Sequence, residues 1–395
     1  MKRILYLTFY FRPDLCAGSF RNSPLADELA AQAEGKEIHI DVLTTSPNRY
    51  KSFREEYETT ERHHNMTIER LEIPTHESGV ADQALSFTSY FFQALRLTSG
   101  RNYDLIFASS SRFFTSYLGY RIAKRNGAPL YLDVRDFFSE TLGDLTEKRL
   151  GRNIYMPVIR RMEKRVYEYA THINLISEGF RPFFRFCKSA DFTTYTHGVD
   201  PVFSRQRFEK PHPNDSPKTI LYAGNIGEGQ GLHTVIPDAA ELLNEEYRFQ
   251  IIGDGGAKKE LEARLKERNI NNVDLLKPVN RKKLIDRYQN ADMTLIHLHD
   301  RPIFTKVLPS KIFELAATEK PILAGVKGEA ASFLKQNVEG AYLFQPGDAS
   351  GMVAQIRAIE KLNGEKKRYD NSDFLKKFSR NQINREMAES ILSYL

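Results

Sequence analysis

Short runs of apolar and β-branched residues recur along the chain, and they alternate with longer stretches in which apolar residues follow helical spacing. In the first half, the runs that predict buried strands cover residues 4–10, 38–44, 66–71, 105–108, 130–134 and 173–176. The helical spacing predicts helices over about 22–33, 83–97, 113–125 and 151–170. Strands that alternate with helices in this way favour a parallel sheet covered by helices.

The same alternation starts again after a charged, proline-rich segment at 205–218, which predicts a linker or a domain-entry loop. Further strands are predicted over 219–223, 248–252, 273–276, 293–298 and 321–326, with helices over 232–243 and up to about 268. A chain of 395 residues is too long for one ordinary domain. We therefore predict two α/β domains, 1–200 and 201–370, and a helical tail, 371–395, that packs back on the first domain.

A helix is predicted to begin at Pro309 and Ser310, with Ser310 as its N-cap, and to end near residue 320. A helix start attracts anions, and Lys311 adds a full positive charge there. Lys in the first turn opposes the helix dipole, which indicates a ligand. We expect a nucleotide pyrophosphate at this helix start and a ribose hydroxyl on Glu314. The alternative is an ordinary α/β helix whose Lys side chain reaches solvent.

A glycine-rich loop, 224–231, follows the first predicted strand of the second domain. Its backbone N–H groups at a strand end suit a phosphate, although no Gly-Lys-Ser/Thr follows as in a P-loop. A second glycine turn, 253–256, follows the next strand. In the first domain, Gly18 and Arg21 fall in a polar loop after the first strand, where doubly wound sheets bind ligands.

Arg135 and Asp136 follow the predicted strand 130–134, so the same rule makes them candidate functional residues. The alternative is a helix cap with a local ion pair. Over residues 148–188, Lys and Arg outnumber Glu and are mixed with aromatic residues. This segment predicts contact with anionic lipid headgroups, and its alternative is a solvated charged face.

The net charge of +6 is mild for this length and does not by itself indicate nucleic acid. It suits phosphorylated substrates or an anionic membrane surface. The two cysteines, Cys16 and Cys187, form neither a metal-binding spacing nor a disulfide framework, so a reducing cytosol is expected. The apolar N-terminal run reads as a strand rather than a signal peptide, and no stretch has the length of a membrane span.

The order of these motifs resembles the GT-B glycosyltransferases, and within them family 4, the retaining group 1 enzymes. The similar segments, in chain order, are FYFRPDLCAGSFRNSPLADELA, VLTTSPNRY, DVRDFFSE, HGVDPVF, YAGNIGEGQGL, FQIIGDGGAKKEL and PSKIFELAATEKPILA. The last is similar to a subgroup that makes O-antigen, capsule and other cell-surface polysaccharides. The resemblance implies two Rossmann-like doubly wound domains facing a central cleft, with the nucleotide sugar on the second and the acceptor on the first.

The resemblance also assigns roles to residues. Asp136 matches the Asp of the family's His-Asp pair, and Arg135 stands where the His would be. Glu314 matches the second of two glutamates eight positions apart, whereas Lys306 stands at the first. Asn225 and Gln230 replace the Arg and Lys that relatives carry in the glycine loop, so Lys311, helped by Lys306 or Arg301, is expected to supply the positive charge.

The implied function is retaining transfer of a sugar from a UDP-sugar to a lipid-linked or glycan acceptor at the inner face of the membrane. Retaining transfer in this fold is thought to proceed by front-side attack, so no protein nucleophile, cofactor or metal is expected. The predicted catalytic residues are Arg135, Asp136 and Lys311. The predicted donor-binding residues are Gly18, Gly224, Asn225, Gly227, Gln230, Gly253, Gly255, Val279, Lys306, Ser310, Lys311, Ile312 and Glu314.

Two other functions stay open at this point. A UDP-N-acetylglucosamine 2-epimerase-like enzyme has the same fold, but the HGVD turn and the PSK helix favour the transferase. The second alternative is a non-catalytic member that binds nucleotide or partners in a polysaccharide assembly. The missing acid at Lys306 supports this alternative.

Overall fold

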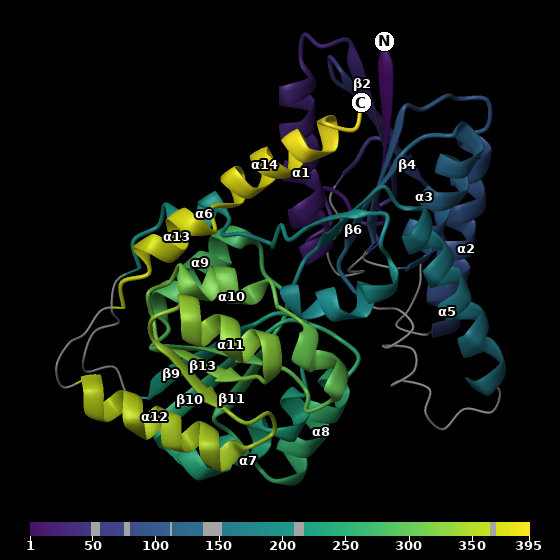
Figure 1. Ribbon diagram of the computed structural model, residues 1–395. Helices are drawn as coiled ribbons and strands as arrows, with labels where there is room; N and C mark the ends of the chain where they lie inside the picture. The colour runs from purple at the N-terminus through teal and green to yellow at the C-terminus, as the bar shows by residue number, and fades with distance from the viewer. Residues whose placement is uncertain (49–55, 75–79, 111–112, 137–151, 209–216, 364–368) are drawn as a thin grey trace. The chain divides into compact units, whose positions relative to one another are not determined.

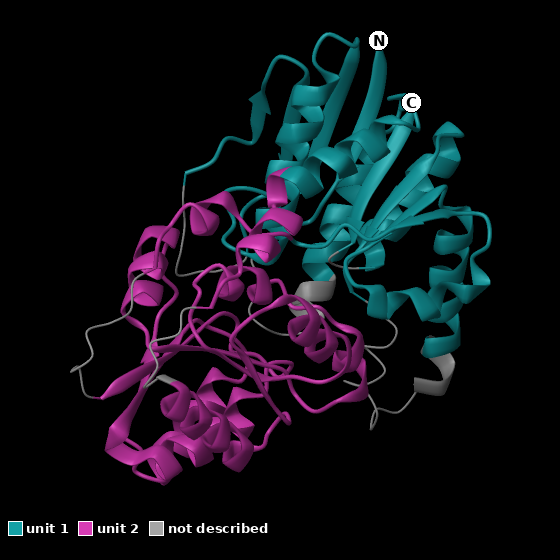
Figure 2. Ribbon diagram, turned by 60° about the vertical axis from the view of Figure 1, so that its left-hand side comes forward, with its two compact units in different colours: residues 1–197, 382–395 teal, residues 198–381 magenta. Residues whose placement is uncertain are grey.

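The structure is a computed structural model, which describes residues 1–48, 56–74, 80–110, 113–136, 152–208, 217–363 and 369–395. The chain forms two compact units (Figure 2). Unit 1 contains residues 1–197 and 382–395, and unit 2 contains residues 198–381.

Unit 1 is built on an eight-stranded sheet in the order β3-β4-β2-β1-β5-β6-β7-β8, in which only the β3–β4 pair is antiparallel. The strands are β1 (Lys2–Leu7), β2 (Ile38–Thr45), β3 (Thr60–Arg62), β4 (Met66–Leu71), β5 (Leu105–Ser110), β6 (Leu130–Val134), β7 (His172–Leu175) and β8 (Asp191–Thr193). The predicted parallel sheet is therefore present. The two short strands β3 and β8 were not predicted, because three-residue polar segments carry no alternating pattern.

Helices cover both faces of this sheet (Figure 1). On one face lie α1 (Ala17–Ala33) and α14 (Arg380–Leu392), whose apolar residues share a core with β1, β2 and β4. On the other lie α2 (Val80–Leu97), α3 (Phe113–Asn126) and α5 (Arg152–Tyr169). A 3₁₀ helix, η1 (Glu178–Phe186), follows β7. Helix α1 begins at Ala17 and not near residue 22, so Gly18 and Arg21 lie in a helix, which corrects their predicted loop position.

Unit 2 is built on a six-stranded parallel sheet in the order β11-β10-β9-β12-β13-β14. Its strands are β9 (Lys218–Ala223), β10 (Tyr247–Ile252), β11 (Val273–Leu276), β12 (Met293–His297), β13 (Ile322–Gly325) and β14 (Ala341–Phe344). Edge strand β14 was not predicted. The order reverses between β9 and β12, and doubly wound sheets bind ligands beyond the carboxyl ends of the strands at such a point.

Two hydrophobic cores fill the two faces of this sheet. One is closed by α9 (Arg281–Asn290), α10 (Lys311–Ala316), α11 (Gly328–Asn337) and α13 (Ser372–Lys377), and the other by α7 (Ile236–Leu243), α8 (Lys258–Glu267) and α12 (Ala349–Asn363). The short elements are α6 (Pro201–Ser204), η2 (Leu232–Thr234), η3 (Asn244–Glu246) and η4 (Pro302–Lys306).

The tail predicted over residues 371–395 divides between the two units. Phe374 of α13 packs in the core of unit 2. Met387, Ala388 and Ile391 of α14 pack in unit 1, against Leu25 and Leu29 of α1 among others. Helix α13 is thus part of the second unit, which corrects the predicted boundary at residue 370. Among the described residues, no helix combines the length and apolar character that a membrane crossing requires.

Candidate active site

The glycine-rich loop 224–231 lies at the end of β9, next to the point where the strand order reverses. Two glycines from the neighbouring turn support it. A Cβ on Gly253 would lie 1.8 Å from the carbonyl oxygen of Gly224, and one on Gly255 would lie 2.4 Å from that of Ile226. Both have φ near +155°, which only glycine adopts readily. Gly253 and Gly255 therefore let the second turn pack directly on the backbone of the glycine loop.

Side chains within the glycine loop bind one another. The Asn225 side-chain amide donates to Oε1 of Gln230 over 2.8 Å, and the Gly227 N–H donates to the same oxygen over 3.2 Å. The Asn225 carbonyl accepts from the Tyr222 hydroxyl at 2.6 Å. Asn225 and Gln230 thus brace the loop in this structure, and the Gly227 N–H that was predicted to face a phosphate is bonded to Gln230.

Two histidines join the glycine loop to the strand on the other side of the reversal point. His297 is buried, its Nδ1 lies 2.6 Å from the Gln230 carbonyl oxygen, and its Nε2 accepts from the Gly347 N–H at 2.9 Å. Burial lowers the pKa of His297 to about 4, so its ring is neutral. The His299 N–H donates to the Gly229 carbonyl over 2.9 Å. The sequence prediction did not include these histidines, because their bonds to the glycine loop span about 70 residues.

Helix α10 places Lys311 and Glu314 on one side, one turn apart. The Lys311 ammonium donates to Oε2 of Glu314 over 2.7 Å, and the two side chains are 23% and 11% exposed. Burial disfavours the charged Lys311, but the Glu314 carboxylate outweighs burial and raises the Lys311 pKa. The pair is an i,i+3 contact, which helical geometry favours. The two residues predicted to hold phosphate and ribose are therefore held together in this structure.

The start of α10 differs from its prediction. Ser310 occupies the N-cap position, as predicted, but its backbone angles are already helical and its side chain makes no capping hydrogen bond. The Ile312 N–H donates to the Pro309 carbonyl at 3.2 Å, and the Ile312 side chain lies in the core. The helix also ends at Ala316, before the predicted residue 320, and Glu319, three residues further on, has a positive φ of 52°.

The other predicted residues of unit 2 lie in its loops. Val279 is half-buried against the core, beyond β11. Lys306 is half-buried at the end of η4, and Phe304 of the same element approaches Gly229, where an added Cβ would meet its ring at 2.9 Å. The segment that carries Lys306 therefore packs on the glycine loop.

In unit 1, a buried network lies beneath the predicted Arg135 and Asp136. Arg21 donates twice to Asp133, over 2.8 Å each, and also donates to the Thr196 carbonyl over 2.7 Å. Asp133 also accepts from Asn174 at 2.8 Å and from Ser109 at 3.1 Å. Burial opposes ionisation, but Arg21 outweighs it and lowers the pKa of Asp133. The sequence prediction missed this network because its members come from five distant segments.

Arg135 lies just above this network, at the carboxyl end of β6. Its Nε and Nη1 are buried, and neither has a hydrogen-bond partner among the described residues. Burial lowers its pKa, against the opposing attraction of Asp133. Asp136 is exposed. A buried guanidinium whose N–H groups have no partner can bind an anionic or hydroxyl-rich ligand. The rest of the predicted motif, residues 137–140, lies outside the described residues.

Two family models match the chain. The model described as Glycosyl transferase 4-like domain matches residues 24–191, and the model described as Glycosyl transferases group 1 matches residues 203–374. The chain therefore belongs to the group 1 glycosyltransferases. It is similar to the protein described as putative colanic acid biosynthesis glycosyl transferase WcaI of Escherichia coli (strain K12), with 32% identity over 172 residues. That match covers 42% of this chain and 41% of the relative, so it spans about two fifths of the relative's length.

Solved structures are similar to this chain in fold. Sucrose-phosphate synthase from Thermosynechococcus elongatus has a TM-score of 0.69 at 15% identity, over 99% of this chain and 95% of that one. HepE from Anabaena, in complex with UDP and glucose, has a TM-score of 0.68 at 17% identity, over the whole of both chains. WaaG, a glycosyltransferase involved in lipopolysaccharide biosynthesis, has a TM-score of 0.61 at 12% identity, over 98% and 95%. The predicted GT-B fold, with two Rossmann-like units, is confirmed.

Proposed function

We propose that this protein is a retaining glycosyltransferase, which moves a sugar from a UDP-sugar to a lipid-linked or glycan acceptor during synthesis of a cell-surface polysaccharide. The observation that carries the proposal is in unit 2, where the braced glycine loop and the Lys311–Glu314 pair both lie beyond carboxyl ends of the sheet. The UDP complexes of HepE and the colanic acid pathway named for WcaI support the choice of donor and product.

Donor phosphates bind at Lys311 and at the backbone N–H groups of Ser310 and Lys311 in this proposal. The Lys311 ammonium turns from Glu314 towards the phosphates, and Glu314 then accepts a ribose hydroxyl. Gln230 releases the Gly227 N–H, which becomes a further phosphate donor. The Lys311 and Glu314 side chains are 23% and 11% exposed, so both charges of the pair act in a partly desolvated environment, where electrostatic effects are large.

The chemistry that these residues support is stabilisation of a leaving group. The main charge that develops during transfer is on the departing pyrophosphate, which the positive charge of Lys311 offsets. Front-side attack lets a donor phosphate oxygen take the acceptor proton, so the protein supplies position and charge rather than a nucleophile. In unit 1, the open donors of Arg135, together with Asp136, bind the sugar or the acceptor.

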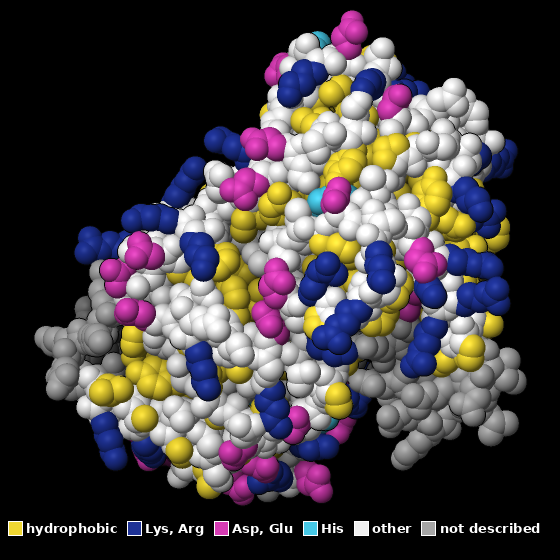
Figure 3. Space-filling view, viewed as in Figure 1, with side chains coloured by type: hydrophobic (Ala, Val, Ile, Leu, Met, Phe, Trp, Pro, Cys, Tyr) yellow, Lys and Arg dark blue, Asp and Glu magenta, His cyan; other side chains and the backbone are white. Residues whose placement is uncertain are grey.

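We also propose that unit 1 docks on an anionic membrane surface, where a lipid-linked acceptor would lie. Helix α5 exposes four basic side chains and an apolar one, and Figure 3 shows Lys and Arg side chains gathered over this helix at the right-hand edge. These residues are Val158, Arg160, Arg161, Lys164 and Arg165. Beside η1, a shallow cavity of about 590 Å³ is lined by Arg181, Arg185 and Lys188 among others. The predicted basic segment begins at 148, and residues 148–151 lie outside the described residues.

Co-sedimentation with vesicles tests the docking. Binding is expected to vesicles that contain phosphatidylglycerol and to be lost with Arg160→Glu/Arg161→Glu, because each basic residue near an anionic surface contributes about 1 kcal/mol. Equal binding to neutral phosphatidylcholine vesicles would contradict this proposal.

A donor screen tests the enzymatic proposal. The purified chain is expected to melt at a higher temperature with a UDP-sugar than with GDP- or TDP-sugars, and to release UDP slowly without an acceptor. Isomerised sugar would indicate the epimerase instead, and bound nucleotide without turnover would indicate the non-catalytic partner. If no nucleotide sugar shifts the melting temperature, the assignment of the donor site is wrong.

A further inference from the structure

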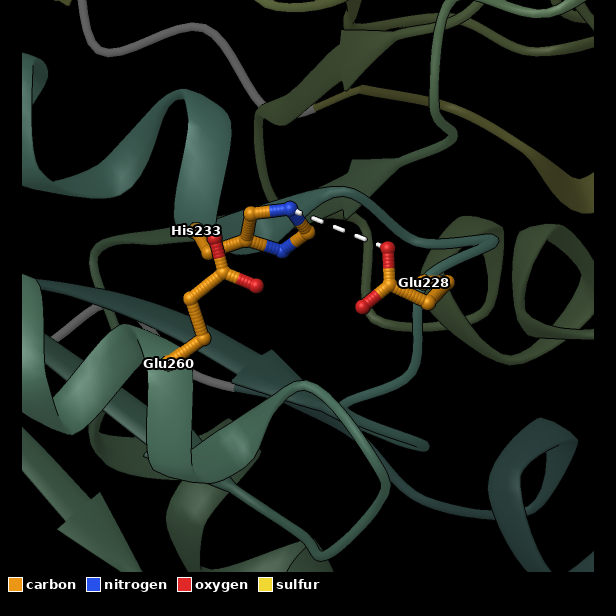
Figure 4. A group of neighbouring side chains, drawn as sticks. All are labelled: Glu228, His233 and Glu260. Carbon is orange, nitrogen blue, oxygen red and sulfur yellow. Dashed lines mark ion pairs between the residues drawn. The ribbon is translucent and has the colours of Figure 1, made fainter. Parts of the chain in front are cut away.

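Three side chains that could bind a metal meet at the back of the glycine loop. Glu228 lies in the loop, His233 in η2 and Glu260 in α8, and one ligand atom of each lies within 4.8 Å of the others. Figure 4 shows the imidazole of His233 between the two carboxylates. No metal was predicted, because residues 228, 233 and 260 match no ligand spacing along the chain.

The bonding of His233 is the second observation. This side chain is buried, with 5% of the residue exposed, and its Nδ1 has no hydrogen-bond partner among the described residues. Its Nε2 lies 4.0 Å from Oε2 of Glu228, which is too long for a hydrogen bond. A buried polar atom without a partner costs about 1–3 kcal/mol, so a ligand that engages it is favoured.

We infer that Glu228, His233 and Glu260 bind a divalent transition-metal ion, which joins the glycine loop to helix α8. One imidazole nitrogen and two carboxylates are a ligand set that suits Zn²⁺, whereas Mg²⁺ and Ca²⁺ prefer oxygen alone. Ligand atoms around Zn²⁺ with bonds of about 2.1 Å lie about 3.4 Å apart in a tetrahedron. The ligand atoms, which lie within 4.8 Å of one another, therefore approach one another by up to about 1.4 Å to reach that geometry, with water as the fourth ligand.

The carboxylates are free to make this movement. The Glu228 and Glu260 side chains are 49% and 45% exposed. Glu260 pairs with Arg264 through Oε1 at 2.7 Å, and an exposed i,i+4 pair of this kind contributes about 0.3–0.5 kcal/mol. That is small beside metal coordination. Arg264 also donates to the His233 carbonyl over 3.0 Å, so η2 already lies against α8 before a metal binds.

Zinc titration of the full chain, treated first with a chelator, tests the site. One equivalent of Zn²⁺ is expected to bind and raise the melting temperature. Glu228→Gln and Glu260→Gln are each expected to weaken the affinity at least about tenfold. Glu262→Gln, an exposed glutamate on the same helix, is the matched control and is expected to bind as the wild type does. Absence of binding, or equal affinity of the two site variants and the wild type, would overturn the inference.

Two further measurements on the wild type do not depend on the folding of any variant. X-ray absorption of the zinc-loaded chain is expected to show one imidazole and several oxygen neighbours, and a shell of oxygen alone would overturn the site. Hydrogen exchange of residues 224–234 is expected to slow when zinc binds. Unchanged exchange of these residues would show that zinc does not link the glycine loop to α8. Neither measurement uses a nucleotide sugar, so their outcome is independent of the proposed reaction.

Discussion

Each unit contains a pair of opposite charges near the carboxyl edge of its sheet, buried in unit 1 and half-buried in unit 2, and the two pairs differ in how many hydrogen bonds they make. In unit 1, the Arg21 and Asp133 side chains are 3% and 0% exposed. Asn174 and Ser109 each donate a further hydrogen bond to the Asp133 carboxylate. In unit 2, Lys311 and Glu314 share a single 2.7 Å bond and are 23% and 11% exposed.

This difference separates a structural pair from one that can exchange partners. A buried carboxylate with four hydrogen bonds has no capacity left for a ligand, and breaking its pair leaves an uncompensated charge. A Lys–Glu pair with one bond keeps donors and acceptors available, because an ammonium has three N–H groups and a carboxylate two oxygens. We therefore expect Asp133 to control stability and Lys311 to control ligand binding.

The largest effect is expected from Asp133→Ala. Loss of the carboxylate leaves the buried Arg21 guanidinium without its partner, which costs about 3–5 kcal/mol of unfolding free energy. Urea unfolding followed by circular dichroism measures it. Asp27→Ala is the control, because the Arg12–Asp27 pair is exposed and is expected to contribute under about 1 kcal/mol. Similar losses of unfolding free energy in both variants would mean that the buried Arg21–Asp133 pair stabilises the fold no more than an exposed pair does.

Lys311→Ala is expected to weaken UDP binding about 10- to 100-fold, the effect of losing hydrogen bonds from a charged donor worth about 1.5–3 kcal/mol. Isothermal titration calorimetry measures the affinity, and thermal melting checks that the fold is kept. Lys327→Ala, which breaks an exposed pair with Asp300 in the same unit, serves as the control and is expected to bind UDP normally. A variant that binds UDP as well as the wild type would show that Lys311 is not at the phosphates.

A further ion pair, also in unit 2, tests whether the number of partners of a carboxylate or its place in the protein decides its effect on stability. Asp200 accepts from Arg380 at 2.6 Å and also pairs with Arg281. Burial opposes ionisation of Asp200, but the two arginines outweigh it and lower its pKa. The stabilisation is therefore full above pH about 4, the unfolded pKa of Asp, and is lost as the pH falls through the lower folded pKa.

Asp200→Asn is accordingly expected to cost about 1–2 kcal/mol at pH 7 and less at pH 2–3, below the unfolded pKa of Asp, where the stabilisation from ionised Asp200 is being lost. Urea midpoints at the two pH values measure the difference. A cost that does not depend on pH would mean that the carboxylate charge is not what Arg281 and Arg380 recognise.

The smallest effect is expected from Glu314→Gln, which keeps the shape of the side chain and removes its charge. We expect UDP to bind about fivefold more weakly, close to 1 kcal/mol. The wild type is also expected to prefer UDP over its 2′,3′-dideoxy analogue, and the variant to lose most of that preference. Calorimetry with both nucleotides measures this preference. An unchanged preference in the variant would mean that Glu314 does not bind the ribose hydroxyls.

Much of the fold followed from local pattern. Each strand predicted in the second half matches a strand of the structure to within about two residues, because buried parallel strands are continuous apolar runs. Edge strand β14 was missed, although edge strand β11 has the same length and is also half-buried and was predicted. The start of α1 was misplaced because Gly18 and the polar residues around it read as a loop, whereas the helix buries Gly18 against Tyr10.

The sequence by itself determined the two α/β units, the glycine loop at a strand end and the placement of Lys311 and Glu314 on one helical turn, because each depends on residues that are neighbours along the chain. Only the tertiary structure decided which charges are already satisfied. Arg21 meets Asp133 across 112 positions, and the cluster of Glu228, His233 and Glu260 forms where the loop packs on α8. Such contacts depend on which elements the sheet brings together, and no local spacing along the chain encodes them.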